Sequence, residues 1–336
     1  MTEQMHAVAY RKNLPITDPA SLEDIELPVP TLRPHDLLVR VEAVSVNPVD
    51  VKQRAGSDPG GEWRVLGYDQ AGTVQAIGDA VTLFAVGDRV YSAGSIDRQG
   101  TDADLHAVDE RIVGRMPASL GFEEAAALPL TSITAWEALF DRFRLTAESD
   151  DTLLVLGGAG GVGSAMIQLA RELTNVTIIA TASRPESEAW VRELGAHQVV
   201  DHHGDLVAQL AEIAPKGVRY VFTPFSAGMI DTFAAIVAPG GEITAIDEPD
   251  GLDIRPLKSK SITWHWELMF TRALYETDDM VEQHRLLDRV AELVDAGRFR
   301  TTLSTTLHGL DAANLREAHR LVESGRTVGK VVVARE

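Results

Sequence analysis

Cysteine is absent from the 336-residue chain. Its absence excludes disulfides, thiolate catalysis and every zinc site built on cysteine. Long apolar runs are also missing, since none approaches the roughly 20 residues that a membrane-spanning helix needs. The N-terminal residues 1–13 lack the apolar core of a secretory signal. We therefore expect a cytoplasmic protein that does not bind a membrane.

Basic residues are few relative to acidic ones. The chain has 31 Lys and Arg against 50 Asp and Glu, a net charge of −19 at pH 7. Nucleic acids and anionic lipid surfaces bind clustered Lys and Arg, so the composition disfavours both as partners. The hydrophobic content of 45% is that of an ordinary globular protein, and the length is sufficient for two domains.

The first third of the chain predicts strands. Residues 5–115 contain alternating or β-branched runs separated by Gly and Asp, which is typical of a mostly antiparallel sheet. Residues 117–143 predict helix, with Ser119 as N-cap and a break or kink at Pro129.

From Asp151 onward, strand-like and helix-like segments alternate. This alternation predicts right-handed βαβ units on a parallel sheet, with a last strand at 261–266. Residues 278–297 then predict an amphipathic helix that ends at Gly297, and residues 329–334 predict a terminal strand. The fold class is therefore α/β, with a β-rich part and a doubly wound parallel-sheet part.

A glycine-rich segment follows the aliphatic run 153–156. Gly158, Gly160 and Gly163 fit the pattern G-x-G-x-x-G between a predicted strand and a predicted helix. In this context the first glycine makes a tight turn, the second lets a pyrophosphate approach the backbone, and the third lets the helix pack on the strand. The sequence therefore predicts a dinucleotide site. Its turn residues are Gly158, Ala159, Gly160, Gly161, Val162 and Gly163.

The end of the next strand indicates which dinucleotide binds. An NAD site usually has Asp or Glu about twenty residues further on, but this segment ends in Ser183 and Arg184. A serine hydroxyl and an arginine fork suit a 2′-phosphate, although the alternative is that Arg184 is an ordinary solvated residue. We favour NADPH over NADH. Loops after two later strands fall at the ligand-binding edge of the sheet and are predicted to contact the nicotinamide ribose: Thr223, Pro224, Phe225, Ser226, Ala245, Ile246 and Asp247.

Several segments together resemble the medium-chain dehydrogenase/reductase superfamily, in its zinc-free, quinone-oxidoreductase-like branch. Residues 264–303 look like the subgroup labelled zinc-type alcohol dehydrogenase-like proteins. The segments that carry the wider resemblance are 46–56, 65–81, 86–91, 126–139, 157–164 and 329–333.

The resemblance implies a GroES-like catalytic domain over 1–125, completed by about 268–336, and a Rossmann NADPH-binding domain over 126–267. It implies an active site in the cleft between these domains, and a homodimer formed through the last Rossmann strand near 261–264.

The sequence departs from the zinc-dependent relatives at the metal ligands. The resemblance places Asn47, Tyr68 and Leu130 where those relatives have Cys, His and Cys. The adjacent His202 and His203 point different ways on any regular element, and His265 lies between two tryptophans. We therefore predict no metal site.

The resemblance also implies roles for individual residues. Asn47 and Asp50 would line the active site near the nicotinamide, and Thr134 and Lys330 would help hold the cofactor. Asp50 could instead be only a turn or cap residue, and Tyr68 could be a proton donor or a rigid wall. A further aromatic group could stack a flat substrate, although core packing is the simpler role: Trp264, Trp266, Phe270 and Tyr275.

Without a metal to stabilise an alkoxide, an electron-poor acceptor is the easier substrate. The leading hypothesis is an NADPH-dependent reductase that transfers hydride to a small flat quinone or α,β-unsaturated carbonyl. The alternatives are a metal-free alcohol or aldehyde reductase and a non-enzymatic NADPH-binding or sensing protein.

Overall fold

The computed structural model describes residues 3–336 and divides the chain into two compact units. Unit 1 comprises Met1–Ile133 and Phe270–Glu336, and unit 2 comprises Thr134–Met269. Among the described residues, no helix combines the length and apolar character that crossing a bilayer requires.

Unit 1 is built on two β-sheets. The smaller has the strand order β2-β1-β4, and the larger has the order β15-β16-β3-β5-β6-β8, with β7 also paired to β3. All these pairs are antiparallel except β15 with β16. The strands are β1 (Gln4–Tyr10), β2 (Glu23–Pro28), β3 (Asp36–Val46), β4 (Arg64–Val65), β5 (Asp69–Ile77), β6 (Arg89–Ser92), β7 (Leu105–Asp109), β8 (Val113–Arg115), β15 (Leu303–His308) and β16 (Lys330–Ala334).

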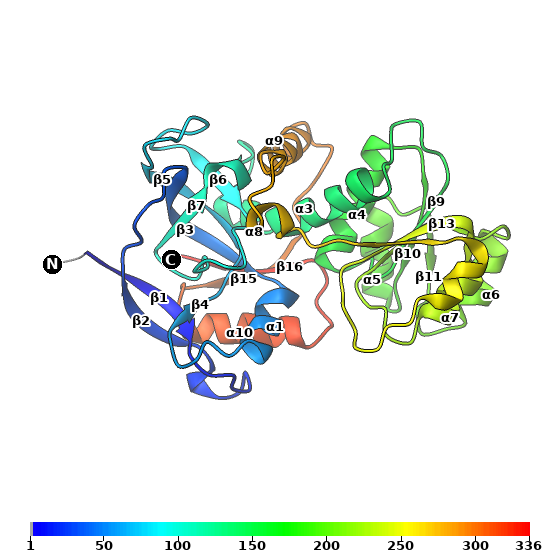
Figure 1. Cartoon of the computed structure of the whole chain (residues 1–336), viewed down its shortest axis with the longest axis horizontal. Helices are drawn as coiled ribbons and strands as arrows, with labels where there is room; N and C mark the ends of the chain where they lie inside the picture. Colours follow the sequence, from blue (N-terminus) through cyan, green and yellow to red (C-terminus); the bar gives the residue numbers. More distant parts are fainter. Residues whose placement is uncertain (1–2) are drawn as a thin grey trace. The chain divides into compact units, whose positions relative to one another are not determined.

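The last strand of the chain lies in the larger sheet of unit 1. Strand β16, red in Figure 1, pairs with β3, with Val332 opposite Ser45. β16 is buried along its whole length, which accounts for its run of valines. This pairing places the first residue of β16, Lys330, beside the end of β3.

The helices of unit 1 lie around these sheets. A short helix after β3 is capped by Asn47, and two amphipathic helices bury their apolar faces. Outside residues 117–143, the α-helices of unit 1 are α1 (Pro48–Gly56), α8 (Thr271–Leu274), α9 (Glu282–Asp295) and α10 (Ala312–Glu323). Gly297, two residues after α9, has a φ of 69° and ends the helix as predicted.

The predicted helix over 117–143 is interrupted. It forms α2 (Phe122–Ala126), α3 (Pro129–Trp136) and a π-helical segment, η3 (Glu137–Arg142), so the break at Pro129 is confirmed. The prediction of Ser119 as N-cap is wrong, because Gly121 occupies that position. Ser119 instead donates its hydroxyl to Asp295 at 2.6 Å, which no local pattern indicates.

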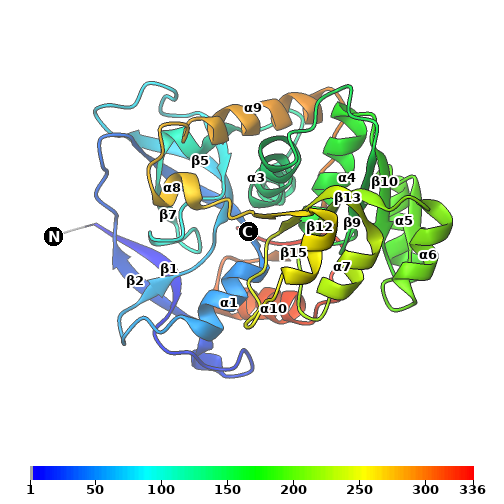
Figure 2. The same ribbon diagram turned by 45° about the vertical axis from the view of Figure 1, so that its right-hand side comes forward.

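Unit 2 contains one six-stranded sheet in the order β11-β10-β9-β12-β13-β14. Every pair in it is parallel, so the predicted doubly wound arrangement is confirmed. Figure 2 shows the connecting helices beside these strands. The strands are β9 (Thr152–Val155), β10 (Thr177–Thr181), β11 (Gln198–Val200), β12 (Val218–Thr223), β13 (Val237–Ala245) and β14 (Thr263–Trp266).

The helices of unit 2 cross between successive strands. Leu154, Val221 and Ile243, on three central strands, are fully buried in one apolar cluster with Phe233. Burial of these strands explains why the sequence runs are continuously aliphatic rather than alternating. The helices are α4 (Gly161–Leu173), α5 (Pro185–Glu193), α6 (Leu206–Ile213) and α7 (Ile230–Ile236).

Candidate functional site

The glycine turn joins β9 to α4 in unit 2, and its geometry explains most of its glycines. A Cβ at Gly163 would lie 2.4 Å from the Gly157 carbonyl oxygen, which no side chain tolerates. A Cβ at Gly158 would lie 3.0 Å from Ala180 Cβ, so the turn packs directly on β10. The left-handed residue is Gly157, with a φ of 66°, rather than Gly158, to which the sequence assigned the tight turn.

Among the described residues, no side chain caps the N-terminus of α4, the helix that follows the glycine turn. Gly160 is the N-cap of α4 and makes no side-chain cap hydrogen bond, and the 13-residue helix begins at Gly161. The first N–H groups of such a helix and its positive dipole end suit a phosphate. The residues from Gly158 to Gly163 therefore fit the pyrophosphate of a dinucleotide.

Ser183 and Arg184 follow β10, next to the glycine turn. Arg184 is exposed and is the N-cap residue of α5, where its backbone N–H donates to Ser187 Oγ at 3.2 Å. Thr181 Oγ1, at the end of β10, accepts a 3.0 Å hydrogen bond from Gly157 N. This bond ties the strand end that carries Ser183 and Arg184 to the turn, which suits one ligand reaching both.

The loops after β12 and β13 are held together by Asp247. Its carboxylate accepts hydrogen bonds from the Ser226 backbone N–H at 2.5 Å and from Ser226 Oγ at 2.6 Å. Pro224 lies against the glycine turn, since a Cβ at Gly157 would be 3.1 Å from Pro224 Cγ. Phe225, beside it, is 40% exposed. Asp247 thus uses its carboxylate within unit 2, and the contact predicted between these loops and the ribose stays a prediction.

Three further residues predicted to contact the cofactor are Ala245, Ile246 and Thr134. Ala245 is fully buried at the end of β13, and Ile246 donates its N–H to the Thr223 carbonyl oxygen at 3.1 Å. Thr134, also predicted to hold the cofactor, is buried in α3. The roles of these residues toward the cofactor remain predictions.

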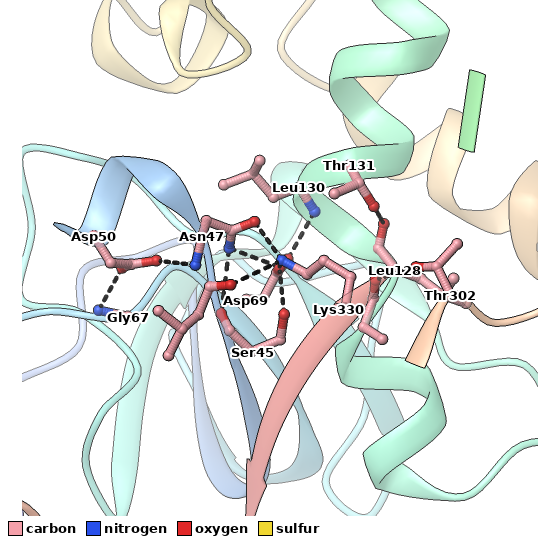
Figure 3. Close-up of polar contacts among 12 residues, drawn as sticks. Ser45, Asn47, Asp50, Gly67, Asp69, Leu128, Leu130, Thr131, Thr302 and Lys330 are labelled. Atoms are coloured by element: carbon pink, nitrogen blue, oxygen red, sulfur yellow. Dashed lines mark hydrogen bonds and ion pairs between the residues drawn. The ribbon is translucent and has the colours of Figure 1, made fainter. Parts of the chain in front are cut away.

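A buried polar cluster in unit 1 surrounds Lys330; we call it the Lys330 cluster, comprising Ser45, Asn47, Asp69, Lys330 and the Leu130 N–H (Figure 3). The Lys330 ammonium lies 3.1 Å from Asp69 Oδ2 and 3.3 Å from the Val46 carbonyl oxygen, and it also donates to Asn47 Oδ1. The other oxygen of the Asp69 carboxylate accepts the Leu130 N–H at 2.7 Å. Lys330 is 4% exposed and Asp69 is fully buried, so the pair is shielded from water.

The partners of Asn47 fix the orientation of its amide. Lys330 can only donate and the ionised Asp69 can only accept, so Asn47 Oδ1 must face Lys330 and Nδ2 must face Asp69, at 2.8 Å. Nδ2 also donates to the Ser45 carbonyl oxygen at 3.2 Å. Asn47 therefore directs its side-chain donors and its acceptor into the Lys330 cluster. Lys330 likewise has protein acceptors of its own, and its predicted contact with the cofactor stays a prediction.

The residues of this region do not fit a zinc ion. Asn47 and Leu130, at two of the positions where the zinc-dependent relatives have ligands, offer an amide already bonded to an ammonium and an aliphatic side chain. A cation beside the Lys330 ammonium would also be repelled. Among residues 3–336, no group of three or more His, Cys, Asp or Glu side chains is placed to hold a metal.

Asp50 accepts two backbone hydrogen bonds, one of them from Gly67, the residue before Tyr68. Its carboxylate accepts the Asn47 N–H at 2.7 Å, which caps α1, and the Gly67 N–H at 3.0 Å. Burial raises the pKa of Asp50 to about 7. Gly67 has a φ of 89°, and a Cβ there would lie 2.4 Å from an oxygen of the buried Asp102 carboxyl. Asp50 therefore has the cap role that the sequence offered as the alternative to a site role.

Tyr68 belongs to the packed interior of unit 1. It is 1% exposed, and its ring meets that of Phe270 edge-on with 4.9 Å between the centroids. Within the described residues its hydroxyl has no hydrogen-bond partner. Burial, with the nearby Asp50 charge, raises the pKa of Tyr68, so the hydroxyl keeps its proton at neutral pH.

The aromatic segment named in the sequence does not act as one group. Phe270 is buried against Tyr68, and Trp264 packs partly buried on the apolar cluster of unit 2. Trp266 and Tyr275 are exposed, at 51% and 73%. His265 donates its Nε2–H to the Glu242 carboxylate at 2.8 Å on the neighbouring strand.

Asp69 was missed by sequence reasoning, although it is the residue that holds the Lys330 cluster together. A signal was present, because Asp69 and Lys330 are opposite charges at the starts of two strands that are otherwise apolar or uncharged. An ionised residue in such a strand needs a buried partner. Which residue becomes that buried partner depends on how β16 and β5 pair with β3, and sequence patterns do not specify this pairing.

The two units together define an NAD(P)H-dependent oxidoreductase: a GroES-like β unit and a Rossmann unit with a glycine turn at the start of its first helix. The family model described as alcohol dehydrogenase GroES-like domain matches residues 33–133, and the model described as zinc-binding dehydrogenase matches residues 194–333. The chain belongs to the medium-chain dehydrogenase/reductase superfamily, in its quinone-oxidoreductase-like branch.

Individual relatives agree with this assignment. A zinc-type alcohol dehydrogenase-like protein of Staphylococcus aureus (strain MSSA476) is 38% identical over 98% of this chain and 99% of its own. A crystal structure from Rhizobium etli CFN 42, which carries the name of a zinc-dependent alcohol dehydrogenase, is 52% identical over 99% of both chains, with a TM-score of 0.95. The chloroplastic NADPH-dependent alkenal/one oxidoreductase of Arabidopsis thaliana is 34% identical over 65% of this chain and 56% of its own.

Proposed function

We propose that this protein is an NADPH-dependent reductase that transfers hydride to a quinone or an α,β-unsaturated carbonyl without a metal ion. The observation that carries the proposal is the Lys330 cluster, which places a bonded amide and an ammonium in the region where a zinc-dependent relative has its ligands. An alkoxide-forming reaction loses its Lewis acid there. Reduction of a conjugated acceptor does not need one, because the new negative charge spreads onto the carbonyl oxygen.

Unit 2 supplies the groups that would hold NADPH. The N–H groups at the start of α4 suit the pyrophosphate, and Ser183 with Arg184 suits the 2′-phosphate, which an arginine fork binds through paired hydrogen bonds. When bound, NADPH supplies a hydride from C4 of its nicotinamide ring. The similarity to an NADPH-dependent alkenal/one oxidoreductase supports both this cofactor and this class of acceptor.

The acceptor also needs a proton, and Tyr68 is the group that we propose donates it. Hydride addition at the β-carbon leaves an enolate, and transfer of the Tyr68 hydroxyl proton to it completes the saturated carbonyl product. The raised pKa of Tyr68 keeps this proton in place before the reaction. No residue in unit 1 accepts a hydrogen bond from the hydroxyl, as far as the chain is described, but the hydroxyl is buried, so the acceptor must displace side chains packed around Tyr68 to reach it.

Steady-state oxidation of NADPH tests the reaction class. The full chain, treated with a chelator, is assayed with 9,10-phenanthrenequinone, with an alkenal and with a saturated aldehyde of the same length. We expect turnover of the first two substrates and little of the third. Turnover of the saturated aldehyde alone would identify an aldehyde reductase instead. NADPH binding without turnover of any electrophile would support the non-enzymatic alternative.

The cofactor preference has a separate test in Arg184→Ala. We expect the variant to bind NADPH at least about tenfold more weakly, because an arginine–phosphate pair is a strong charge-assisted interaction, and to bind NADH unchanged. Equal NADPH affinity in the two proteins, or tighter binding of NADH by the original protein, would contradict the assignment of NADPH.

A further inference from the structure

Two helices of unit 2 are joined by a hydrogen bond between their side chains. Trp190 of α5 donates its indole Nε1–H to Ser164 Oγ of α4 at 2.8 Å. Ser164 is fully buried, and Trp190 is half-buried. Figure 2 shows α4 and α5 next to each other in this unit. Because an indole nitrogen can only donate, Ser164 Oγ is the acceptor in this bond and keeps its own proton for another partner.

Ser164 also faces the glycine turn. Its Oγ lies 3.5 Å from the Gly158 carbonyl oxygen, which accepts the remaining hydroxyl proton. The Ser164 backbone N–H donates to the Gly160 carbonyl oxygen at 2.9 Å, so the residue belongs to the first turn of α4. Val191, next to Trp190, packs here as well, since its Cγ1 would lie 3.2 Å from a Cβ at Gly158. One face of α5 therefore rests on the turn that suits the pyrophosphate.

The start of α5 carries the arginine assigned to the 2′-phosphate. Arg184 is the N-cap residue of this nine-residue helix. Ser187 closes that end, because its Oγ accepts the Arg184 N–H at 3.2 Å and donates to the Arg184 carbonyl oxygen at 2.9 Å. Trp190 lies further along the same helix, about 9 Å away at 1.5 Å per residue. A helix this short moves as one piece, so a bond that fixes Trp190 also fixes the backbone of Arg184.

A second bond joins the same two regions on the strand side. Gly157 of the turn donates its N–H to Thr181 Oγ1 at 3.0 Å, and Ser183 follows Thr181 closely in the chain. The pyrophosphate turn and the residues assigned to the 2′-phosphate are thus connected twice, once through the strand ends and once through the helices. Two connections fix a spacing and an angle that one connection leaves free to change.

We propose that the hydrogen bond between Trp190 and Ser164 sets the spacing of the two phosphate sites and so determines the preference for a 2′-phosphorylated dinucleotide. Trp190 and Ser164 are positioning residues, which act through α5 and α4 rather than by touching a phosphate. The proposal rests on the NADPH preference proposed above and adds the contact that holds Arg184 in place. A ligand that uses both sites gains from a preset spacing, whereas a ligand that uses one site does not.

Loss of the bond should therefore weaken only ligands that carry both phosphates. Adenosine 2′,5′-bisphosphate spans the two sites, whereas adenosine 5′-monophosphate and adenosine 2′-monophosphate each use one of them. When α5 is free to shift, binding of the bisphosphate must restore the spacing, so its dissociation constant should rise by about fivefold or more. The dissociation constants of the two monophosphates should change by less than about twofold, because each binds its own site wherever that site lies.

Calorimetric titration of the full chain with these three nucleotides tests the proposal. Trp190→Phe removes the indole N–H and keeps an aromatic ring, and Ser164→Ala removes the acceptor. We expect each variant to lose affinity for the bisphosphate alone. The double variant W190F/S164A should lose no more than the weaker of the two single variants, because both substitutions remove the same bond. Trp63→Phe, at a tryptophan of unit 1 that lies against the Arg11 guanidinium, is the matched control and should bind all three ligands as the original protein does.

The outcomes separate this proposal from the one on which it rests. If the variants bind the bisphosphate as the original protein does, or weaken all three ligands equally, the positioning role is overturned and the NADPH preference stands. If the original protein binds the bisphosphate no more tightly than adenosine 5′-monophosphate, the NADPH preference itself fails, and the positioning role with it. Circular dichroism shows whether each variant is folded, and Ser164→Ala decides the question if Trp190→Phe does not fold.

Discussion

At the scale of single residues, the buried pair of Lys330 and Asp69 shows how two opposite charges are accommodated in the interior of unit 1. An ionised lysine is tolerated in the interior only with several oxygen partners, and Lys330 has acceptors from Asp69, Asn47 and Val46. Such a pair adds little stability compared with apolar residues, but removing one partner leaves the other charge uncompensated. Asn47 depends on both charges for its orientation.

Lys330→Met should therefore destabilise the protein strongly. We expect the free energy of unfolding to fall by about 3 kcal/mol or more, measured by urea denaturation, because Asp69 is left buried without its cation. The double variant K330M/D69N should recover part of the loss. Arg320→Met, which breaks an exposed pair with Glu317, is the control and should leave stability nearly unchanged. Equal effects of the two single variants would show that the buried pair has no special cost.

His319 should make the protein sensitive to acid. Burial lowers its pKa to about 3, with a further effect from Arg54, whereas an unfolded histidine titrates near 6.5. The unfolded state therefore takes up the proton first, and stability is lost as the pH falls from about 6.5 toward 3. Between about pH 6.5 and 4.5, His319→Leu should lose less stability than the original protein, by on the order of 2 kcal/mol, in urea denaturation. An exposed control, His308→Leu, should lose stability with falling pH as the original protein does. If His319→Leu lost as much stability as the original protein, the buried His319 would not be the cause of the acid sensitivity.

At the scale of elements, the glycine turn is set by packing as much as by the ligand. Gly163 faces the backbone of Gly157 and Gly158, and Gly158 faces Ala180 and Val191. The sequence pattern predicted the site because strand, turn and helix all had their expected lengths. It placed the left-handed turn one residue too late, because a run of five glycines in seven residues does not show which one adopts positive φ.

Gly163→Ala should damage both stability and cofactor binding. Its Cβ would lie 2.4 Å from the Gly157 carbonyl oxygen, so α4 must move away from the turn, at a cost of roughly 1–3 kcal/mol. We expect a lower melting temperature and a higher dissociation constant for NADPH, measured by quenching of protein fluorescence. Gly56→Ala is the control, because a Cβ there meets nothing within 4 Å, and it should change neither quantity. Unchanged NADPH binding in Gly163→Ala would show that the turn does not hold the cofactor.

The last strand of unit 2 bears on the predicted homodimer. β14 ends the strand order of its sheet, and Trp266 and the nearby Leu268 are 51% and 49% exposed. An apolar edge strand of this kind favours association with another chain. Light scattering after size-exclusion chromatography should give the mass of a dimer, and Trp266→Lys should shift it toward the monomer. A monomeric original protein at micromolar concentration would contradict the homodimer.

At the scale of the whole molecule, the sequence was most informative where local pattern and fold coincide. The parallel sheet of unit 2 follows from alternating strand and helix segments, and the β-rich character of unit 1 follows from its turn signals. The pairing of β16 with β3 and the contact of Ser119 with Asp295 join residues that are far apart in the sequence. No local propensity specifies such contacts, so the Lys330 cluster could not be derived from residue types alone, whereas the cap role of Asp50, a local contact with the Asn47 N–H, was one of the two roles that the sequence offered.

The central claim is that hydride reaches carbon of a conjugated acceptor without help from a metal. The most direct measurement uses the chelator-treated protein, NADPH deuterated at C4 and an alkenal, with the product analysed by mass spectrometry and NMR. We expect a saturated aldehyde with deuterium on the carbon β to the carbonyl. An allylic alcohol with deuterium on the carbonyl carbon, or turnover that appears only when zinc is restored, would contradict it.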